Sequence, residues 1–209
     1  MVEKNDNRRS WDWYSKLYDW EVLRFSGKAY QEMYDSMEKI LAKDMKVLEV
    51  ATGTGLIAHN IASFVKEIYA IDFAPKMIEV AKKKGTVSNL KFSVEDATNL
   101  SYPNESFDAV IISNALHIMP NPELVLENIK RVLKPSGILI APTFSHGHLD
   151  DKSWNFGAFL LKLIGFQTYA KWTYEQYLTF ISNNGFRVTN SKVLDAAFPL
   201  IYLEAKKEN

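Results

Sequence analysis

The spacing of hydrophobic and polar residues changes character near residue 45. Before that point apolar residues recur at helical spacing, and we predict two amphipathic helices over residues 11–20 and 28–43. Beyond it, short runs rich in Val, Ile and Leu alternate with segments of helix length. We predict strands over residues 46–50, 67–71, 90–94, 108–113 and 137–143, and helices over residues 55–65, 75–84 and 121–133.

The alternation of strands and helices indicates the type of sheet. Right-handed crossover connections place helices over a mainly parallel sheet, on both of its faces, and such sheets bind ligands at their carboxyl ends. The last part of the chain predicts a helix over residues 174–183, a turn at residues 183–185, and strands over 186–194 and 200–205. Because no repeat or linker interrupts the pattern, we predict one domain over residues 1–209.

Composition and charge narrow the classes of function. The formal net charge is +0, so no global field favours nucleic acid, and the absence of cysteine excludes disulfides and thiolate chemistry within this sequence. The longest apolar stretch, residues 156–166, is shorter than the roughly 20 residues that a membrane-spanning helix needs. The first ten residues are polar and show no secretory signal, and we expect a cytoplasmic protein with no transmembrane segment.

The most informative local pattern is a buried strand that runs into a glycine-bearing turn and then into a helix. Gly53 and Gly55 permit close approach of the backbone to a ligand, and the amino terminus of the helix presents unpaired N–H groups. The pattern reads Val47-Leu48-Glu49-Val50-Ala51-Thr52-Gly53-Thr54-Gly55. It predicts a site for a nucleotide-like cofactor.

Two classes of cofactor fit this turn. Ala58 completes a Gly-x-Gly-x-x-Ala pattern, and Asp72 lies at the distance expected for a ribose contact, as in nicotinamide-dependent oxidoreductases. Glu49 favours the other class, because a carboxylate at the strand end opposes the pyrophosphate of NAD but attracts the α-ammonium group of a methionine moiety. We therefore favour S-adenosylmethionine and keep NAD as the alternative.

Residues 46–143, with weaker similarity out to residue 188, resemble the class I, Rossmann-like S-adenosylmethionine-dependent methyltransferases. Ala51 replaces the first glycine of many members, a variation also common in ubiquinone- and menaquinone-type methyltransferases. The resemblance implies a three-layer α/β/α fold with a seven-stranded, mostly parallel sheet whose last strand is antiparallel. It also implies methyl transfer from S-adenosyl-L-methionine to a small-molecule acceptor, with release of S-adenosyl-L-homocysteine.

The resemblance also implies roles for particular residues. Asp72 would accept hydrogen bonds from the ribose hydroxyls, Phe73 and Met77 would flank the adenine, and Asp96 would lie near the adenine amino group. The remaining residues expected at the cofactor are Glu49, Ala51, Thr52, Gly53, Gly55, Ala97, Ser113, Asn114, Tyr14 and Tyr18. Tyr14 and Tyr18 belong to an aromatic segment, residues 11–20, that either closes over the cofactor or docks its helix on the core.

The acceptor side is less well defined. His117 follows the fourth strand and is a candidate general base for an oxygen or nitrogen acceptor, although a histidine here can equally pack in the pocket wall. We expect the acceptor to contact His117, His146, Phe156, Phe159 and Trp172. The apolar segment over residues 153–172 suits an apolar acceptor or a peripheral membrane contact, or forms a cap that buries its own side chains. We predict no metal, although His146, His148 and the acids that follow them make one conceivable.

Four parts are expected within the single domain: an amino-terminal helical lid (1–44), a cofactor-binding core (45–145), a substrate-cap insertion (146–172), and a closing helix with its strands (173–209). Three hypotheses remain for function: a small-molecule methyltransferase, an NAD-dependent oxidoreductase, and a non-catalytic S-adenosylmethionine-binding protein. Residues 113–116 lack the Asn/Asp-Pro-Pro-aromatic pattern of methylation on planar nitrogen, which disfavours nucleic-acid bases as acceptors. We expect a monomer or a homodimer; the sequence does not identify the acceptor.

Overall fold

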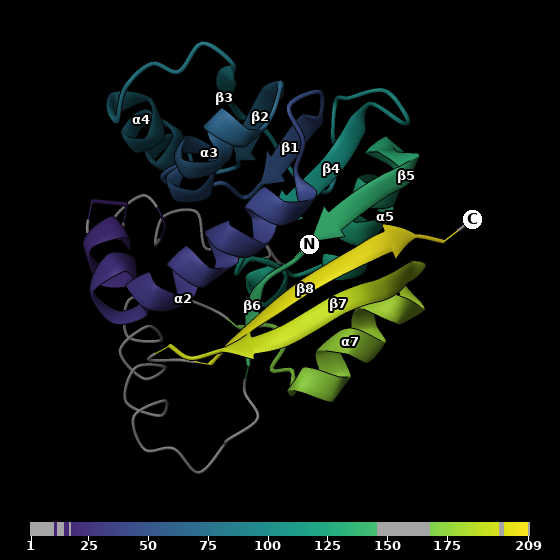
Figure 1. Cartoon of the computed structure of the whole chain (residues 1–209). Helices are drawn as coiled ribbons and strands as arrows, with labels where there is room; N and C mark the ends of the chain where they lie inside the picture. The colour runs from purple at the N-terminus through teal and green to yellow at the C-terminus, as the bar shows by residue number, and fades with distance from the viewer. Residues whose placement is uncertain (1–10, 12–14, 17, 146–167, 197–198, 209) are drawn as a thin grey trace, which may run out of the picture.

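One mixed sheet organises the computed structural model, which describes residues 11, 15–16, 18–145, 168–196 and 199–208 (Figure 1). The strands run in the order β3-β2-β1-β4-β5-β8-β6, and β7 pairs with β8. Their bounds are β1 Lys46–Val50, β2 Glu67–Asp72, β3 Leu90–Val94, β4 Phe107–Ile112, β5 Leu133–Ile140, β6 Thr143–Phe144, β7 Phe186–Leu194 and β8 Leu200–Lys207. Strands β1 to β5 are mutually parallel, whereas β8 runs antiparallel to β5, β6 and β7. The α/β fold class with an antiparallel last strand is confirmed.

The described residues form eight strands rather than seven, for a local reason. The two-residue strand β6 follows β5 after Ala141 and Pro142, and both strands pair with β8. Strand β5 also begins at Leu133, earlier than the predicted residue 137, and its register with β4 shifts beyond the Phe107–Leu133 pair. Pro135 lies in this irregular stretch, where the missing N–H of a proline is tolerated.

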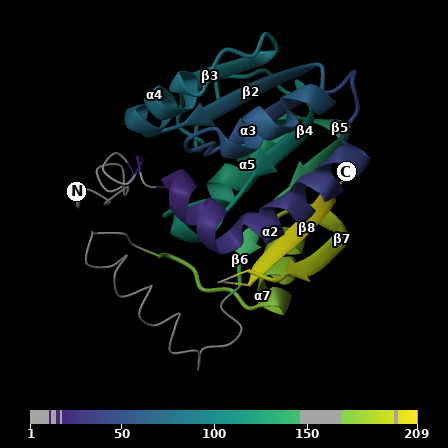
Figure 2. The ribbon, with the colours of Figure 1, turned by 60° about the vertical axis from the view of Figure 1, so that its left-hand side comes forward.

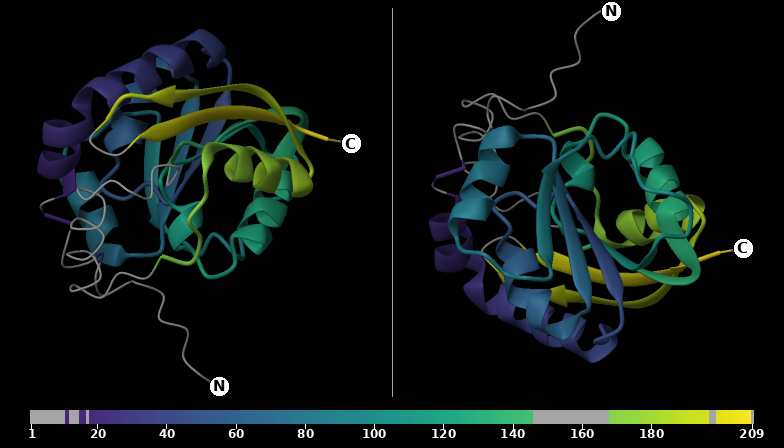
Figure 3. Two further views of the ribbon diagram at one scale, coloured as in Figure 1. Left: turned by 90° about the horizontal axis from the view of Figure 1, so that it is seen from below. Right: turned by 90° about the horizontal axis from the view of Figure 1, so that it is seen from above.

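Helices cover both faces of the sheet (Figure 3). Their bounds are α2 Tyr18–Ile40, α3 Leu56–Ile61, α4 Pro75–Lys83, α5 Pro122–Val132 and α7 Tyr174–Asn183, with short 3₁₀ helices η1 Ala62–Phe64 and η2 Leu116–Ile118. Alternate side chains of β1 face opposite layers, as a strand requires: Leu48 and Val50 pack with α5 and α7, whereas Val47 packs with α2 and α3. Among the described residues, no helix is long and apolar enough to cross a membrane.

The predicted break between two amino-terminal helices is wrong, because α2 is continuous over Tyr18–Ile40. Gly27 lies inside it, at a cost of about 1 kcal/mol relative to alanine. Burial of Ala29, Tyr30, Met33 and Met37 against the sheet outweighs that cost, since each large apolar side chain contributes roughly 1.5–3 kcal/mol. Figure 2 shows α2 running along the same side of the molecule as α3.

Candidate functional site

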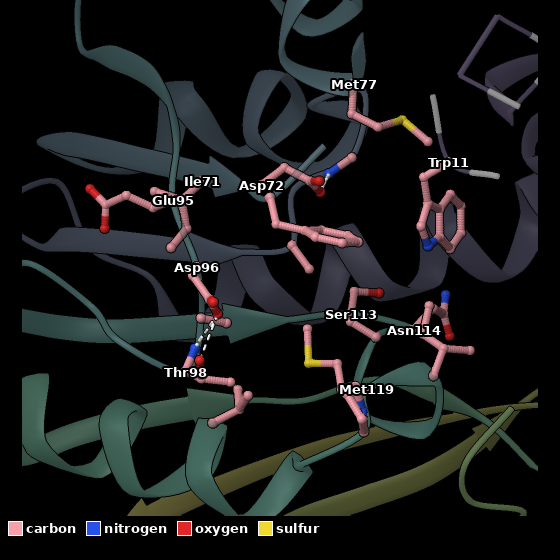
Figure 4. A pocket seen from close by; sticks show the side chains of 18 of the residues that line it. Trp11, Ile71, Asp72, Met77, Glu95, Asp96, Thr98, Ser113, Asn114 and Met119 are labelled. Carbon is pink, nitrogen blue, oxygen red and sulfur yellow. Dashed lines mark hydrogen bonds between the residues drawn. The ribbon is translucent and has the colours of Figure 1, made fainter. Parts of the chain in front are cut away.

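A cavity of about 290 Å³ lies where β1, β2 and β4 end at their carboxyl edge (Figure 4). Its size is close to the lower end of the range for small-molecule sites, and parallel sheets bind ligands at this edge. The described residues that line it are Trp11, Tyr18, Ala51, Gly53, Ile71, Asp72, Phe73, Met77, Glu95, Asp96, Ala97, Thr98, Ser113, Asn114, Ala115, Ile118, Met119, Pro120, Asn121 and Val125. Most of the residues expected to bind a cofactor are thus brought together.

The two glycines of the first turn serve different purposes. Both have left-handed backbones, with φ of 57° at Gly53 and 74° at Gly55. A Cβ at Gly53 would meet no atom within 4 Å, and Gly53 lines the cavity, so its missing side chain leaves room for a ligand. A Cβ at Gly55 would lie 2.8 Å from the ring of Phe92. Gly55 therefore supports packing and does not line the cavity.

Asp72 joins the first turn to the loop after β2. Its Oδ2 accepts a hydrogen bond from the Gly53 backbone N–H at 2.8 Å, and its Oδ1 accepts one from the Ala74 N–H at 2.9 Å. Only 6% of the residue is exposed, yet it lines the cavity. In general a carboxylate oxygen can accept two hydrogen bonds. These two backbone bonds therefore do not fill the acceptor capacity of the Asp72 carboxylate.

Asp96 is held on the loop after β3. Its Oδ1 accepts hydrogen bonds from the backbone N–H and the hydroxyl of Thr98, both at 2.8 Å. The residue is exposed and lines the cavity beside Ala97, with Phe73 and Met77 also in the wall. The three residues expected around an adenine ring therefore share one cavity.

Ser113 and Asn114 follow β4 and present polar atoms to the cavity. The left-handed backbone of Asn114, with φ of 51°, is fixed by a 2.8 Å hydrogen bond from its N–H to the Pro142 carbonyl. Its Nδ2 donates to the Tyr30 hydroxyl at 3.2 Å. The Asn114 Oδ1 and the Ser113 Oγ are buried and have no hydrogen-bond partner within the described part of the chain. Since buried polar atoms are nearly always paired, these two are suited to receive a ligand.

Glu49 lies in a smaller hollow, of about 20 Å³, that adjoins the main cavity through Tyr18, Ala51 and Ser113. The residue is 2% exposed and accepts a 2.6 Å hydrogen bond from the Thr52 hydroxyl. Burial raises the pKa of Glu49 to about 8, against the lowering effect of that hydrogen bond. The carboxyl group of the ligand-free protein is thus mostly neutral at pH 7, which weakens the charge argument against NAD at that pH.

The raised pKa of Glu49 predicts a pH dependence of stability. The folded protein binds a proton at Glu49 up to about pH 8, whereas an ordinary glutamate in the unfolded chain releases it near its usual pKa of about 4.3. Stability therefore falls as pH rises between these two values, relative to a Glu49→Gln variant. Thermal unfolding of both proteins from pH 5 to 9 measures the difference. A gap between the two curves that is constant across this range would contradict the assignment.

Two residues expected at the acceptor lie outside the cavity wall. His117 is 8% exposed, its Nδ1 lies 3.1 Å from the Thr143 hydroxyl, and it is absent from the described residues that line the cavity. Trp172 stacks on Phe180, with ring centroids 4.5 Å apart, and packs against the core beside α7. In this structure both residues make packing or hydrogen-bonding contacts with the protein itself.

Tyr14, His146, Phe156 and Phe159 lie outside the described residues, and their roles stay predictions. Glu49 and Thr52 line the smaller hollow and Gly55 lines neither space. Sequence reasoning assigned no ligand contact to Trp11 or Tyr30. Trp11 belongs to the aromatic segment that was noted, whereas Tyr30 carries no local signal, since it meets Asn114 across 84 positions of sequence.

Comparison with known proteins agrees with this geometry. Residues 48–141 match the family model described as "Methyltransferase domain". A demethylmenaquinone methyltransferase of Paenarthrobacter aurescens is 39% identical over 101 residues, which cover 48% of this chain and 39% of that protein. The ubiquinone/menaquinone biosynthesis C-methyltransferase of Pasteurella multocida is 35% identical over 133 residues, covering 59% and 50%. The chain spans about half or less of the length of these relatives.

Solved structures share the fold. A putative methyltransferase of Haloferax volcanii, solved in complex with the Trm112 activator, has a TM-score of 0.81 at 16% identity, covering 97% of each chain. A putative methyltransferase of Bacillus halodurans has a TM-score of 0.71 at 18% identity, covering 86% of this chain and 100% of that one. The [4+2]-cyclase SpnF has a TM-score of 0.70 at 20% identity, covering 85% and 80%. At these identities the likeness concerns the fold alone.

The fold is similar to that of solved methyltransferases, and the cavity lies at the edge where parallel sheets bind ligands. Residues 48–141 match the methyltransferase-domain family, and the relatives named above as quinone methyltransferases are similar to part of this chain.

Proposed function

We propose that this protein transfers a methyl group from S-adenosyl-L-methionine to a small-molecule acceptor. The observation that carries the proposal is the convergence of Gly53, Asp72, Asp96 and Asn114 on one cavity, each from a different strand end. The chain's similarity to relatives named as quinone methyltransferases supports it.

The residues present fit the cofactor. The space left by the missing Cβ of Gly53 admits a ligand close to the backbone, and the Asp72 carboxylate would accept hydrogen bonds from ribose hydroxyls. The unpartnered Ser113 Oγ and Asn114 Oδ1 would accept from the methionine end, near the Glu49 hollow. Arrival of an α-ammonium group there favours the charged form of Glu49, since an opposite charge lowers the pKa of a carboxyl group.

S-adenosylmethionine supplies a methyl group already activated by its sulfonium, so the protein's task is to bind, orient and exclude water. Phe73, Met77 and Ile118 contribute apolar wall, and Tyr18 and Trp11 add aromatic wall from the amino-terminal segment. Good alignment in such sites contributes on the order of 7–11 kcal/mol to lowering a barrier. Alignment lowers the barrier to methyl transfer itself, while an acceptor that loses a proton on methylation passes it to water or to a side chain, and His117 as that side chain stays a prediction.

The acceptor is proposed only by class, as a small molecule with an apolar or aromatic portion. The relatives include a malonyl-[acyl-carrier protein] O-methyltransferase of Bacillus cereus as well as the quinone enzymes, so related chains serve different acceptors. A fold shared with a cyclase shows that architecture does not fix the reaction. Cytoplasmic location, peripheral membrane contact and the choice of monomer or homodimer likewise stay predictions.

Calorimetric titration with S-adenosylmethionine, S-adenosylhomocysteine and NAD, in parallel, tests the proposal. We expect micromolar binding of the first two and none of NAD, because Asn114 Oδ1 and Glu49 would accept from an α-ammonium group and offer no donor to a pyrophosphate. Binding of NAD alone would overturn the proposal and favour an oxidoreductase. Binding of the first two, with no turnover across quinone-like, amine and carboxylate acceptors, would favour the non-catalytic alternative.

A further inference from the structure

The first turn of α2 is tied to the cofactor-binding core by three polar side chains, which we call the latch: Asp19, Thr54 and Lys84. One carboxylate oxygen of Asp19 accepts a hydrogen bond from the Thr54 hydroxyl, and the other pairs with the Lys84 ammonium. The Lys84 Nζ also donates to the Thr54 Oγ1 at 3.1 Å. Each member of the latch thus contacts the other two.

The latch joins three separate segments that all serve the cavity. Thr54 is fully buried between Gly53 and Gly55, on the turn after β1. Lys84 caps the carboxyl end of α4, the helix that follows the Asp72 loop. Asp19 lies next to Tyr18, which lines both the main cavity and the Glu49 hollow. A movement of α2 away from the turn after β1 would therefore break the latch and, at the same time, displace Tyr18.

Tyr18 is held at its other end as well. Its side chain lines the Glu49 hollow together with Tyr30, whose hydroxyl accepts from Asn114, and its ring makes an edge contact with Trp11 at a centroid separation of 6.0 Å. The latch fixes the backbone next to Tyr18, and the contact with Trp11 restrains the ring. Together these contacts determine the position of the Tyr18 ring in the cavity wall.

We propose that Asp19 is a positioning residue that, through Thr54 and Lys84, holds Tyr18 in the cofactor cavity wall. The inference rests on the proposed function for the identity of the ligand, but not for the geometry of the latch. The two charged side chains are 25% and 29% exposed, so the ion pair is partly shielded from water and its contribution exceeds that of a fully exposed pair. Removing either charge should loosen the cavity wall without unfolding the core.

The test compares Asp19→Ala, Lys84→Met and the double variant with the wild type by calorimetric titration of S-adenosylhomocysteine. We expect each single variant to bind about fivefold more weakly, and the double variant to lose less than the two single losses combined, since the Asp19–Lys84 pair is lost in all three variants. Lys84→Arg, which keeps the charge, should restore most of the affinity. Lys83→Met, the same change one residue earlier on α4, is the matched control and should bind like the wild type.

Hydrogen exchange of the ligand-free proteins gives a readout that does not depend on the cofactor. The amides of Tyr18–Phe25 should exchange faster in Asp19→Ala and Lys84→Met, while those of β1 and β4 keep their protection. Unchanged exchange at Tyr18–Phe25, or additive losses of affinity in the double variant, would overturn the latch. If the wild type itself binds no S-adenosylhomocysteine, the proposed function fails, and the exchange measurement still decides the latch.

Discussion

Replacing Asp72 with alanine is expected to weaken binding of S-adenosylmethionine by more than tenfold. The change removes the acceptors proposed for the ribose hydroxyls, and charge-assisted hydrogen bonds are among the strongest that a site offers. It also releases the Gly53 and Ala74 backbone N–H groups, which donate to the carboxylate at 2.8 and 2.9 Å. A donor left without a partner costs about 1–3 kcal/mol, and the first turn loses its tie to the loop after β2.

The control for this variant is Asp108→Ala. Asp108 lies near the amino end of β4, pairs with Lys134 at 2.6 Å and accepts from the Lys46 N–H at 2.8 Å, away from the described cavity wall. Its loss removes a comparable set of contacts and should lower stability without changing affinity. Calorimetric titration of both variants makes the comparison. Wild-type affinity in Asp72→Ala would remove the ribose assignment.

Replacing Gly55 with alanine is expected to lower the free energy of unfolding by roughly 2–5 kcal/mol. A left-handed backbone costs a non-glycine residue about 1–2 kcal/mol, and overpacking a core typically costs a further 1–3 kcal/mol. Both costs apply here, because φ is 74° and the added Cβ would lie 2.8 Å from the Phe92 ring and 3.1 Å from the Ala81 Cβ. Urea denaturation followed by circular dichroism measures the loss.

Gly53→Ala is the matched variant on the same turn. Its φ of 57° imposes a similar backbone cost, but its Cβ would meet nothing within 4 Å, so we expect the smaller destabilisation. Adding Phe92→Leu to Gly55→Ala should recover part of the stability by relieving the contact with the ring. Equal destabilisation by the two glycine substitutions, with no recovery from Phe92→Leu, would show that backbone conformation alone requires Gly55.

Local sequence patterns predicted most of the strands and the glycine turn, because each depends on residues close in sequence. Asp72 was predicted from its distance to that turn and from the family resemblance, and Asp96 from the resemblance; both line the cavity. The continuity of α2 was not predicted because Gly27 disfavours a helix locally, whereas burial against the sheet decides the outcome. The early start of β5 was likewise set by pairing with β4.

Contacts between distant segments could not be predicted from the sequence. Tyr30 meets Asn114 across 84 positions and Asp19 meets Thr54 across 35, and no periodicity or motif specifies either pair. The pKa of Glu49 is also a property of the fold, because burial raises it and no neighbour in sequence indicates how deeply the carboxyl group is buried. Residue roles that depend on one local motif can therefore be predicted from the sequence. Contacts and pKa values that depend on burial by distant segments cannot.

The place of β4 in the sheet has a consequence for how the protein acquires its site during synthesis. Strand β4 pairs with β1, although β2 and β3 are made between them. A nascent chain that ends before residue 113 therefore carries Gly53, Asp72 and Asp96 but lacks one wall of the cavity. A ligand that binds between the loops after β1, β2 and β3 and the segment after β4 stabilises only chains that contain all of these segments. Such a ligand therefore favours completed molecules over truncated ones.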